Sequence, residues 1–501
     1  MHAADRTAVI APDGTFTYRN LDEAAERVCA ALADGASNLN EARVAYLVPP
    51  SFAHVAVTRG IWRAGGIAVP LAVSHPAAEL EFVIRDADAS IVIGDPISAA
   101  MLEPIARRAG ARFALTTDLL ARAGSRTFSS SSFAPDRRAL IVYTSGTTGK
   151  PKGVVSTHGN LAAQIGSLID AWAWTRDDHT LLVLPLHHVH GIVNVVGCAL
   201  SSGATCEMLP AFDTEAAWER LASGEITVFT AVPTIYHRLI ASWDAASAGV
   251  QRARSEGCRR ARLMMSGSAA LPLQTLDRWR EISGHTLLER YGMTEIGMAL
   301  SNPLLGERRP GSVGSPLPGV DVRLVDDAGH EIADGTAGEL EVRGPGVFLE
   351  YWRRPDETRS AFRDGWFRTG DVAVVEHGAY RLLGRTSVDI IKTGGYKVSA
   401  LEVEEVIRAH PAVSDCAVVG IVDPEWGERV SVAVELHARA ALSLENLHAW
   451  AKARLAPYKI PRELHCMPSL PRNAMGKVLK PEVAKLMQAD ESGAAKSPGH
   501  S

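Results

Sequence analysis

Short runs of consecutive apolar residues recur along the first part of the chain, and each run ends directly in small or polar residues. Such runs occupy residues 139–143, 181–184, 228–232 and 263–265. Because their apolar residues are consecutive rather than alternating, they predict strands of a sheet that is buried on both faces. Helical patterns at 161–172 and 215–221 lie between them. This alternation predicts an α/β fold with ligands at the carboxyl ends of the strands.

The pattern changes near Gly311, where short β-rich runs replace the helical alternation. The runs 320–325, 338–342 and 380–383 predict a β-subdomain that caps the α/β layers. After Gly384-Arg385, an amphipathic helix at 401–409 and a strand at 415–422 predict a smaller α+β unit. We therefore expect a large N-terminal body of layered α/β subdomains plus a β-subdomain, followed by a small C-terminal domain. The predicted boundaries are 1–384 for the body, 385–387 for a hinge, 388–487 for the C-terminal domain and 488–501 for a flexible tail.

Composition narrows the class of protein. The 501 residues are 46% apolar and 22% charged, which is typical of a soluble globular protein of several domains. A formal net charge of −5 argues against a dedicated nucleic-acid binder. The six cysteines are scattered without a CxxC pair, as is typical of a reducing compartment. No apolar run is long enough to span a membrane, and the first residues carry no secretory signal pattern. We therefore expect a cytoplasmic enzyme.

The most informative polar loop follows the predicted strand 139–143. Its glycines let the backbone approach an anion, while its hydroxyl groups and lysines add donors and positive charge. The residues concerned are Thr144, Ser145, Gly146, Thr147, Thr148, Gly149, Lys150 and Lys152. The loop differs from a Walker A loop, because Pro151 stands where that motif requires Ser or Thr. A flexible surface loop has a similar composition, but the preceding buried strand favours a phosphate-binding loop.

The chain resembles the adenylate-forming superfamily, which includes acyl-CoA synthetases, peptide-synthetase adenylation domains and luciferases. The resemblance spans residues 15–480, and the motifs come in the family's order. Besides the phosphate loop, they are Ser-Gly-Ser-Ala-Ala at 266–270, Tyr-Gly-Met-Thr-Glu at 291–295, Thr-Gly-Asp at 369–371, Gly-Arg at 384–385 and Pro-Arg-Asn-Ala-Met-Gly-Lys at 471–477. The resemblance implies that a carboxylate attacks the α-phosphorus of ATP. Since both reactants are anions, such catalysis rests on charge neutralisation and in-line positioning.

The resemblance also assigns roles to the motif residues. The loop 144–152 would hold the β- and γ-phosphates, and Thr294 would contact the α-phosphate. Glu295 would help to bind Mg²⁺, and Lys477 would bridge the α-phosphate and the attacking carboxylate during adenylation alone. The remaining nucleotide-binding residues are Tyr291, Gly267 and Ser268 near the adenine, Asp371 with Arg385 near the ribose, and also Glu289 and Gly292. For Asp371 a turn or N-cap role, and for Lys477 a solvated turn, remain the alternatives.

A second step and a moving domain follow from the same resemblance. In the family, the small C-terminal domain swings after adenylation and presents a glycine loop to the pantetheine arm. Here that loop is Gly394-Gly395-Tyr396. The usual pivot is an Asp or Lys two residues after the Gly-Arg pair, whereas this chain has Ser387. We expect free CoA as the acyl acceptor, because no carrier domain follows Lys480.

The histidines of the segment His187-His188-Val189-His190 follow the predicted strand 181–184. They lack nearby carboxylate or cysteine partners at metal-ligand spacing, so no histidine metal site is predicted. By resemblance, His188 lies near the acyl pocket and acts in catalysis, and His190 lines the pocket. Packed histidines at a strand end remain the alternative.

Two arginines point to the acid substrate. Arg290 precedes Tyr291, and Arg238 lies in the segment 232–238. Both segments resemble those of malonyl-CoA synthetases. An arginine can bind bidentately the carboxylate of a dicarboxylic acid that does not react. The alternative is that they form structural salt bridges, for example with Glu289 or Asp244.

The sequence therefore predicts an ATP-dependent ligase that forms malonyl-CoA, with methylmalonate left open as the acid. A ligase for another small or medium-chain acid, or a stand-alone adenylation module that loads a separate carrier protein, remains an alternative. The expected co-substrates are ATP and CoA, with Mg²⁺ as the metal. We expect only small-molecule partners, no nucleic acid, no membrane span and a monomer or homodimer.

Overall fold

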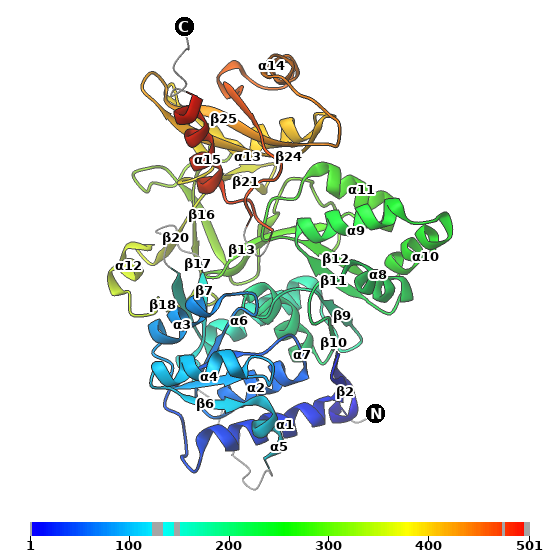
Figure 1. The fold of residues 1–501 in the computed structure, drawn as a ribbon, viewed down its shortest axis with the longest axis vertical. Helices are drawn as coiled ribbons and strands as arrows, with labels where there is room; N and C mark the ends of the chain where they lie inside the picture. The colour runs from blue at the N-terminus through cyan, green and yellow to red at the C-terminus, as the bar shows by residue number, and fades with distance from the viewer. Residues whose placement is uncertain (1–2, 123–133, 145–150, 473–475, 495–501) are drawn as a thin grey trace.

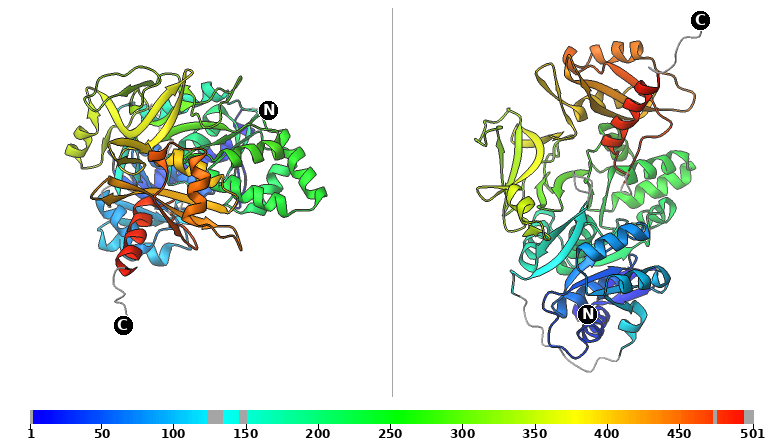
Figure 2. Two further views of the ribbon diagram at one scale, coloured as in Figure 1. Left: turned by 90° about the horizontal axis from the view of Figure 1, so that it is seen from above. Right: turned by 60° about the vertical axis from the view of Figure 1, so that its left-hand side comes forward.

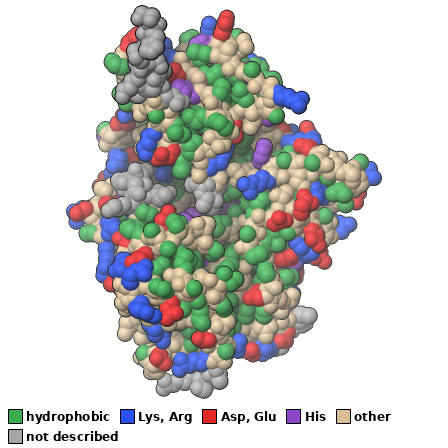
Figure 3. Space-filling model, in the orientation of Figure 1, with side chains coloured by type: hydrophobic (Ala, Val, Ile, Leu, Met, Phe, Trp, Pro, Cys, Tyr) green, Lys and Arg blue, Asp and Glu red, His purple; other side chains and the backbone are tan. Residues whose placement is uncertain are grey.

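The computed structural model describes residues 3–122, 134–144, 151–472 and 476–494. Within them the chain forms a body of α/β layers, a β-subdomain and a smaller C-terminal unit, which follow one another along the chain (Figure 1). No helix in these ranges is long and apolar enough to cross a membrane. Basic and acidic side chains are interspersed over the face of the molecule in Figure 3.

A seven-stranded sheet forms one layer of the body, in the order β18-β8-β7-β4-β3-β5-β6. Its strands are β3 (Arg43–Leu47), β4 (Ile67–Pro70), β5 (Ile91–Gly94), β6 (Arg112–Leu115), β7 (Arg138–Thr144), β8 (Lys152–Thr157) and β18 (Glu350–Tyr351). Strands β3 to β7 are parallel, while β8 and β18 are antiparallel additions at one edge. The phosphate loop predicted from the sequence connects β7 to β8, and its residues 145–150 lie outside the described part of the chain.

A nine-stranded sheet forms the second layer, in the order β15-β14-β13-β12-β11-β9-β10-β1-β2. Its strands are β1 (Thr7–Ala11), β2 (Gly14–Thr17), β9 (His179–Leu182), β10 (Thr205–Met208), β11 (Val228–Ala231), β12 (Leu263–Ser266), β13 (Leu288–Met293), β14 (Gly297–Ser301) and β15 (Ser315–Pro316). The neighbours β9, β11, β12 and β13 are parallel, so their carboxyl ends lie at one edge. Antiparallel β14 then extends the sheet beside β13.

Helices cover both layers. They are α1 (Tyr18–Ala33), α2 (Phe52–Arg63), α3 (Ala77–Asp86), α4 (Ala99–Arg108), α5 (Thr116–Ala121), α6 (His158–Trp172), α7 (Cys198–Ser202), α8 (Thr214–Ser223), α9 (Pro233–Ala245), α10 (Ala248–Arg259) and α11 (Leu273–Ser283). Strand β3 shows why its sheet needs cover on both faces: Val44 and Tyr46 belong to one apolar core, and Ala45 and Leu47 to another. The first core also contains residues of α1, α2, α6 and the nine-stranded sheet, so it joins the two layers.

Local sequence signals set the ends of the helices beside the site. Helix α6 begins with a capping box, in which the Thr157 hydroxyl accepts from the backbone N–H of Asn160 and the Asn160 side chain accepts from Thr157. Helix α9 begins with Pro233, whose fixed φ suits a first helical turn. Between β9 and α7, His190–Gly197 forms a π-helical segment (η2), a rare geometry that is frequent at functional sites.

The β-subdomain and the C-terminal unit each contain a smaller sheet. The β-subdomain has β16 (Asp321–Val325), β17 (Gly338–Arg343), β19 (Phe362–Arg363), β20 (Trp366–Glu376) and β21 (Ala379–Arg385), with α12 (Pro355–Ser360) beside it. The C-terminal unit has β22 (Ile390–Thr393), β23 (Tyr396–Ser399), β24 (Val413–Asp423), β25 (Gly427–Leu436) and β26 (Glu463–Cys466), with α13 (Ala400–Arg408), α14 (Leu444–Lys452) and α15 (Lys480–Ala494). Figure 2 shows this unit at one end of the molecule. It has its own apolar cores, one of them built around Val403, Ile407, Val418 and Val432.

The predicted fold class is confirmed: a layered α/β body carries a β-subdomain and a small α+β unit. One expectation was wrong in part. Residues 488–494, predicted as flexible tail, continue helix α15 to Ala494. They include Gln488 and Ala489, which have high helix propensity and extend a helix that is already formed.

The connection between the β-subdomain and the C-terminal unit is a short hydrogen-bonded turn. The backbone N–H of Asp389 donates to the carbonyl of Arg385 at 2.7 Å, and the Asp389 carboxylate accepts from the N–H of Arg385 at 3.0 Å. Lys480 of α15 pairs with the same carboxylate and with Glu404 of α13. Asp389 is thus fixed to the C-terminal unit by Lys480 and to the preceding strand by Arg385. Ser387 is exposed within this turn.

Candidate active site

The predicted site residues of the body gather at the carboxyl ends of β11, β12 and β13. Strand β13 carries Glu289, Arg290 and Tyr291, while Gly267 and Ser268 follow β12 directly. His190 opens the π-helical segment η2 and reaches the same edge through Ser268. This is where an α/β sheet places its ligands.

Arg290 lies at the centre of this group. Its side chain is buried, with 3% of the residue exposed. Nη2 donates to Nε2 of His190 and, at 2.9 Å, to the hydroxyl of Thr230 on β11. The guanidinium also lies 5.8 Å from the centre of the Trp172 ring at the end of α6. A Cβ atom at position 267 would overlap Nη1 of Arg290, so the glycine of the Ser-Gly-Ser motif makes room for this arginine.

No carboxylate pairs with Arg290 within the part of the chain that the structure describes. Its Nε and Nη1 are buried and have no hydrogen-bond partner there. The salt bridges considered as alternatives are not formed: the Glu289 carboxyl accepts from the N–H of Gly311, and Asp244 pairs with Arg278. Burial lowers the pKa of Arg290 to about 10, which leaves the side chain protonated at neutral pH. A buried cation with unsatisfied donors is costly unless an anion reaches it.

His190 is neutral and has a defined orientation. Burial, with Arg290 and His188 nearby, lowers the pKa of His190 well below its usual value. Because Nε2 faces the Arg290 donor, it accepts, and Nδ1–H donates to the Ser268 hydroxyl at 3.0 Å. His190 thus connects Arg290 to Ser268, which has a φ of 68° in the left-handed region.

His188 lies next to His187, with ring centres 4.2 Å apart. Burial, together with His75, lowers the pKa of His188 to about 4, so this histidine is also neutral at pH 7. Among the described residues, no group of three or more metal-ligating side chains is found.

The residues predicted to lie near the adenine and the ribose include three that are in mutual contact. The Tyr291 hydroxyl donates to Oδ2 of Asp371 at 2.6 Å, and Nε of Arg385 donates to Oδ1 at 3.0 Å. These three residues come from β13, β20 and β21. Their contacts bring these predicted nucleotide-binding side chains of the body beside the turn that leads to the C-terminal unit.

Glu295, predicted to help bind Mg²⁺, is buried in the turn between β13 and β14. Its Oε1 accepts a hydrogen bond from the Tyr351 hydroxyl at 2.9 Å, and burial raises the pKa of its carboxyl group. A single carboxylate does not make a complete protein site for a cation. It does fit Mg²⁺, which is commonly held by one or two carboxylates together with substrate phosphates. Thr294 and Gly292 flank this turn and are half-buried.

The two ends of the predicted phosphate loop are ordered by different contacts. Thr144 ends β7, and Lys152 begins β8, where the two residues are paired in register. Lys152 forms an ion pair with Glu357 of α12, and its ammonium lies 5.4 Å from the centre of the Tyr351 ring. The predicted loop residues Ser145, Gly146, Thr147, Thr148, Gly149 and Lys150 lie outside the described residues.

Gly476, the residue before Lys477, lies close to the body. A Cβ atom on Gly476 would come within 3.1 Å of the Thr234 side chain at the start of α9. Arg238 lies four residues after Thr234, and residues at this spacing share a helix face. Arg238 is exposed, in contrast to buried Arg290. The structure therefore places Arg238 on the face of α9 beside the Lys477 loop, and does not bring it into contact with Arg290.

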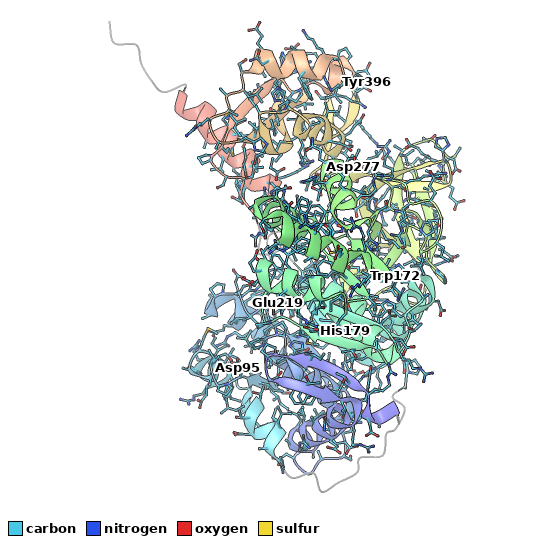
Figure 4. All side chains as sticks on the ribbon, turned by 90° about the vertical axis from the view of Figure 1, so that its right-hand side faces the viewer. Asp95, Trp172, His179, Glu219, Asp277 and Tyr396 are labelled. Atoms are coloured by element: carbon cyan, nitrogen blue, oxygen red, sulfur yellow. The ribbon has the colours of Figure 1, made fainter. Side chains whose placement is uncertain are left out.

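The predicted pantetheine loop lies elsewhere in this orientation. Gly394 and Gly395 have φ angles of 54° and 83°, a region that favours glycine. Tyr396 is 55% exposed and stacks on Tyr458, with ring centres 4.3 Å apart. Figure 4 shows Tyr396 on the C-terminal unit and Trp172, which marks the Arg290 site, in the body. The loop and the Arg290 site are thus apart here.

Three contacting residues were not predicted from the sequence: Thr230, Trp172 and Tyr351. Thr230 is a polar residue inside the apolar run 228–232, which was a usable signal. Trp172 and Tyr351 carried no such signal, because an aromatic residue at the end of a helix or in a short strand is usually part of the core.

Comparison with known proteins shows which family of enzymes the chain belongs to. Residues 1–352 match the AMP-binding enzyme family, and residues 402–477 match the AMP-binding enzyme C-terminal domain. The chain belongs to this family of enzymes. It is 46% identical to the mitochondrial malonate–CoA ligase ACSF3 of Mus musculus, over 99% of this chain and 90% of that protein. It is 41% identical to a malonate–CoA ligase of Arabidopsis thaliana, over 98% of this chain and 88% of that protein.

A solved structure supports the same assignment to the AMP-binding enzyme family. The ATP-bound crystal structure of MatB from Rhodopseudomonas palustris superimposes with a TM-score of 0.90, at 35% identity and with 97% of each chain covered. The predicted membership of the adenylate-forming superfamily is thereby confirmed, as is the class of AMP-forming acid–CoA ligases.

Proposed function

We propose that this chain is an ATP-dependent malonate–CoA ligase that forms malonyl-CoA through a malonyl-adenylate and releases AMP and pyrophosphate. The observation that carries the proposal is the buried guanidinium of Arg290, whose Nε and Nη1 have no partner among the described residues. The names of the relatives from Mus musculus and Arabidopsis thaliana support the same acid.

The physical argument concerns the second carboxylate of the acid. Malonate has one carboxylate that reacts and one that does not, and Arg290 offers the latter its two unpartnered donor groups, Nε–H and Nη1. A charge-assisted hydrogen bond of this kind contributes about 1.5–3 kcal/mol. An acid without a second carboxylate leaves the buried cation unpaired, so acetate and fatty acids are disfavoured.

In the proposed first step, a carboxylate oxygen of malonate bonds to the α-phosphorus of ATP, and the bond from that phosphorus to pyrophosphate breaks. Arg290 fixes the distal carboxylate, with His190 orienting the guanidinium. The Asp371 carboxylate is held by hydrogen bonds from Tyr291 and Arg385 and accepts hydrogen bonds from the ribose hydroxyls. Thr294 would donate a hydrogen bond to the α-phosphate, and the ammonium groups of Lys152 and Lys477 would neutralise phosphate charge. Mg²⁺ held through Glu295 would supply further positive charge to the phosphates.

In the proposed second step, the thiol sulfur of CoA bonds to the acyl carbon, AMP leaves with the electrons of the broken bond, and the thiol proton passes to solvent. The C-terminal domain, residues 388–487, would rotate about residues 385–387 to bring Gly394, Gly395 and Tyr396 to the acyl group. The closeness of Gly476 to Thr234, which leaves little room for a Cβ atom at position 476, supports the observed orientation as the one for the first step. The turn between Arg385 and Asp389 supports a pivot held by Asp389, in place of an Asp or Lys at position 387.

Three further features belong to this proposal. The metal is Mg²⁺, the enzyme acts as a monomer or homodimer, and its compartment is the cytoplasm. The relatives named above include a mitochondrial protein, so cell fractionation with an antibody against the chain is the test of the compartment.

The proposed reaction is tested by product analysis. The full chain is incubated with malonate, ATP, CoA and MgCl₂, and the products are quantified by mass spectrometry. We expect malonyl-CoA, AMP and pyrophosphate in equal amounts. Release of ADP, or malonyl transfer to acyl carrier protein without transfer to free CoA, would contradict the proposal.

A further inference from the structure

A short segment of the chain connects the predicted metal ligand to the predicted phosphate loop. Residues 348–352 contain strand β18, which pairs with β8 through Glu350 and Val155 and through Tyr351 and Val154. The N–H of Trp352 donates to the carbonyl of Gly153 at 2.7 Å. Strand β8 begins at Lys152, directly after the phosphate loop. The segment is therefore fixed to the end of that loop.

The same segment is fixed to Glu295 at two points. The N–H of Phe348 donates to the backbone carbonyl of Glu295 at 2.7 Å, and the Tyr351 hydroxyl donates to its Oε1 at 2.9 Å. The backbone bond fixes where the glutamate lies, and the hydroxyl fixes how its carboxylate is turned. Among the described residues, Tyr351 is the side chain that donates to this carboxylate.

Tyr351 also contacts the cation at the end of the phosphate loop. The Lys152 ammonium lies 5.4 Å from the centre of the Tyr351 ring, within the range of a cation–π interaction. Tyr351 itself is held in place, because its N–H donates to the Thr358 hydroxyl at 3.0 Å and its ring packs against Phe348 at 4.8 Å. One tyrosine thus contacts both a carboxylate and a cation of the predicted ATP site, through different parts of its side chain.

We propose that Tyr351 is a positioning residue for ATP and its metal ion: its hydroxyl holds Oε1 of Glu295 so that the other carboxylate oxygen faces the cation. This inference rests on the proposed function and assigns a role to a residue outside the motifs. Partners that orient a metal-binding carboxylate commonly change metal affinity by about 10- to 100-fold when they are removed. The ring, by contrast, supports Lys152 and remains in a phenylalanine variant.

The test measures binding of ATP, in the absence of acid and CoA, by isothermal titration calorimetry at increasing MgCl₂ concentrations. For Tyr351→Phe we expect the MgCl₂ concentration that gives half-maximal ATP affinity to rise about 10-fold. The melting temperature of Tyr351→Phe should fall no further below that of the wild type than the melting temperature of the matched control, Tyr18→Phe. This control removes a hydroxyl that donates to the carbonyl of Ala204 at 2.7 Å. An unchanged MgCl₂ dependence for Tyr351→Phe would overturn the proposal.

A double variant separates positioning from a general structural role. Glu295→Gln keeps an oxygen that can accept from Tyr351 but removes the charge that binds the cation. If Tyr351 acts through Glu295, adding Tyr351→Phe to Glu295→Gln leaves the MgCl₂ dependence as it is in Glu295→Gln alone. Independent, additive losses would overturn the proposal. Because no acid is present, failure of this test is distinguishable from failure of the malonate assignment.

Discussion

Arg290 and His190 lie 100 residues apart in the chain, yet Nη2 of the arginine donates to Nε2 of the neutral histidine. The histidine can accept because burial, with Arg290 beside it, keeps the pKa of its ring well below the usual value. A protonated histidine would repel the guanidinium and could not accept its hydrogen bond. The pair therefore holds a single positive charge at the edge of the nine-stranded sheet, with two buried donor atoms that have no hydrogen-bond partner in the described part of the chain.

Replacing Arg290 with Ala should lower kcat/KM for malonate by about 10- to 160-fold, the equivalent of 1.5–3 kcal/mol. Residual turnover of acetate should change much less, because acetate has no second carboxylate for Arg290 to bind. The measurement is AMP release with each acid. Arg252→Ala, which removes an exposed arginine of α10, is the control and should match the wild type. Equal losses for malonate and acetate would refute the proposed role of Arg290.

Lys477→Ala should abolish formation of malonyl-adenylate, measured as malonate-dependent exchange of pyrophosphate into ATP. Thioester formation from supplied malonyl-adenylate and CoA should persist, because Lys477 is assigned to the first step alone. The position of the Gly476 loop against Thr234 is the structural basis for this division. Lys485→Ala on α15 provides an exposed lysine as control. Equal loss of both half-reactions would show that the division is wrong.

Asp389→Asn should weaken the turn that holds the C-terminal unit in its observed orientation. The substitution removes the charge that pairs with Lys480, while the shape of the side chain is kept. We expect pyrophosphate exchange to fall roughly 10-fold, as for loss of one charge-assisted hydrogen bond, with a smaller effect on thioester formation. The control is Asp327→Ala, which breaks the exposed pair with Lys397 between the same two regions and should have little effect. A larger loss with Asp327→Ala would contradict a pivot held by Asp389.

Stability should depend on the protonation of Glu289. Burial raises the pKa of this carboxyl group to about 8, whereas an unfolded glutamate has a pKa of about 4.3. The folded state therefore holds a proton that the unfolded state has lost, so stability falls as the pH rises through the window between these values. Glu289→Gln mimics the protonated form and keeps an acceptor for Gly311. The melting temperature of Glu289→Gln should exceed that of the wild type by a margin that grows from pH 5 to pH 8. A constant difference across this range would contradict the claim that the buried Glu289 carboxyl is protonated in the folded state.

The strands of the core were predictable because their burial leaves a direct pattern in the sequence. The runs 228–232 and 263–265 became β11 and β12, neighbours in one parallel sheet. The run 139–143 became β7 in the other sheet. An apolar run shows that a strand is buried, but it does not show which strands pair.

The site was only partly predictable, since its chemistry depends on contacts between distant segments. Arg290 and Arg238 looked equivalent in the sequence, but one is buried on a strand and the other is exposed on a helix. Arg290 meets Trp172 and Thr230, which come from α6 and β11. The contact between Tyr351 and Glu295 likewise joins a strand of the seven-stranded sheet to the turn between β13 and β14 of the nine-stranded sheet. No local pattern marks such contacts.

The central claim is that the buried Arg290 selects a dicarboxylic acid. The most direct test compares kcat/KM for malonate, succinate, acetate, benzoate and octanoate, measured as AMP release that depends on both ATP and CoA. We expect malonate to be the best substrate. Its kcat/KM should exceed that of acetate by a factor of about 10 or more, which is the gain that one charge-assisted contact provides. A preference for acetate, benzoate or octanoate would contradict it.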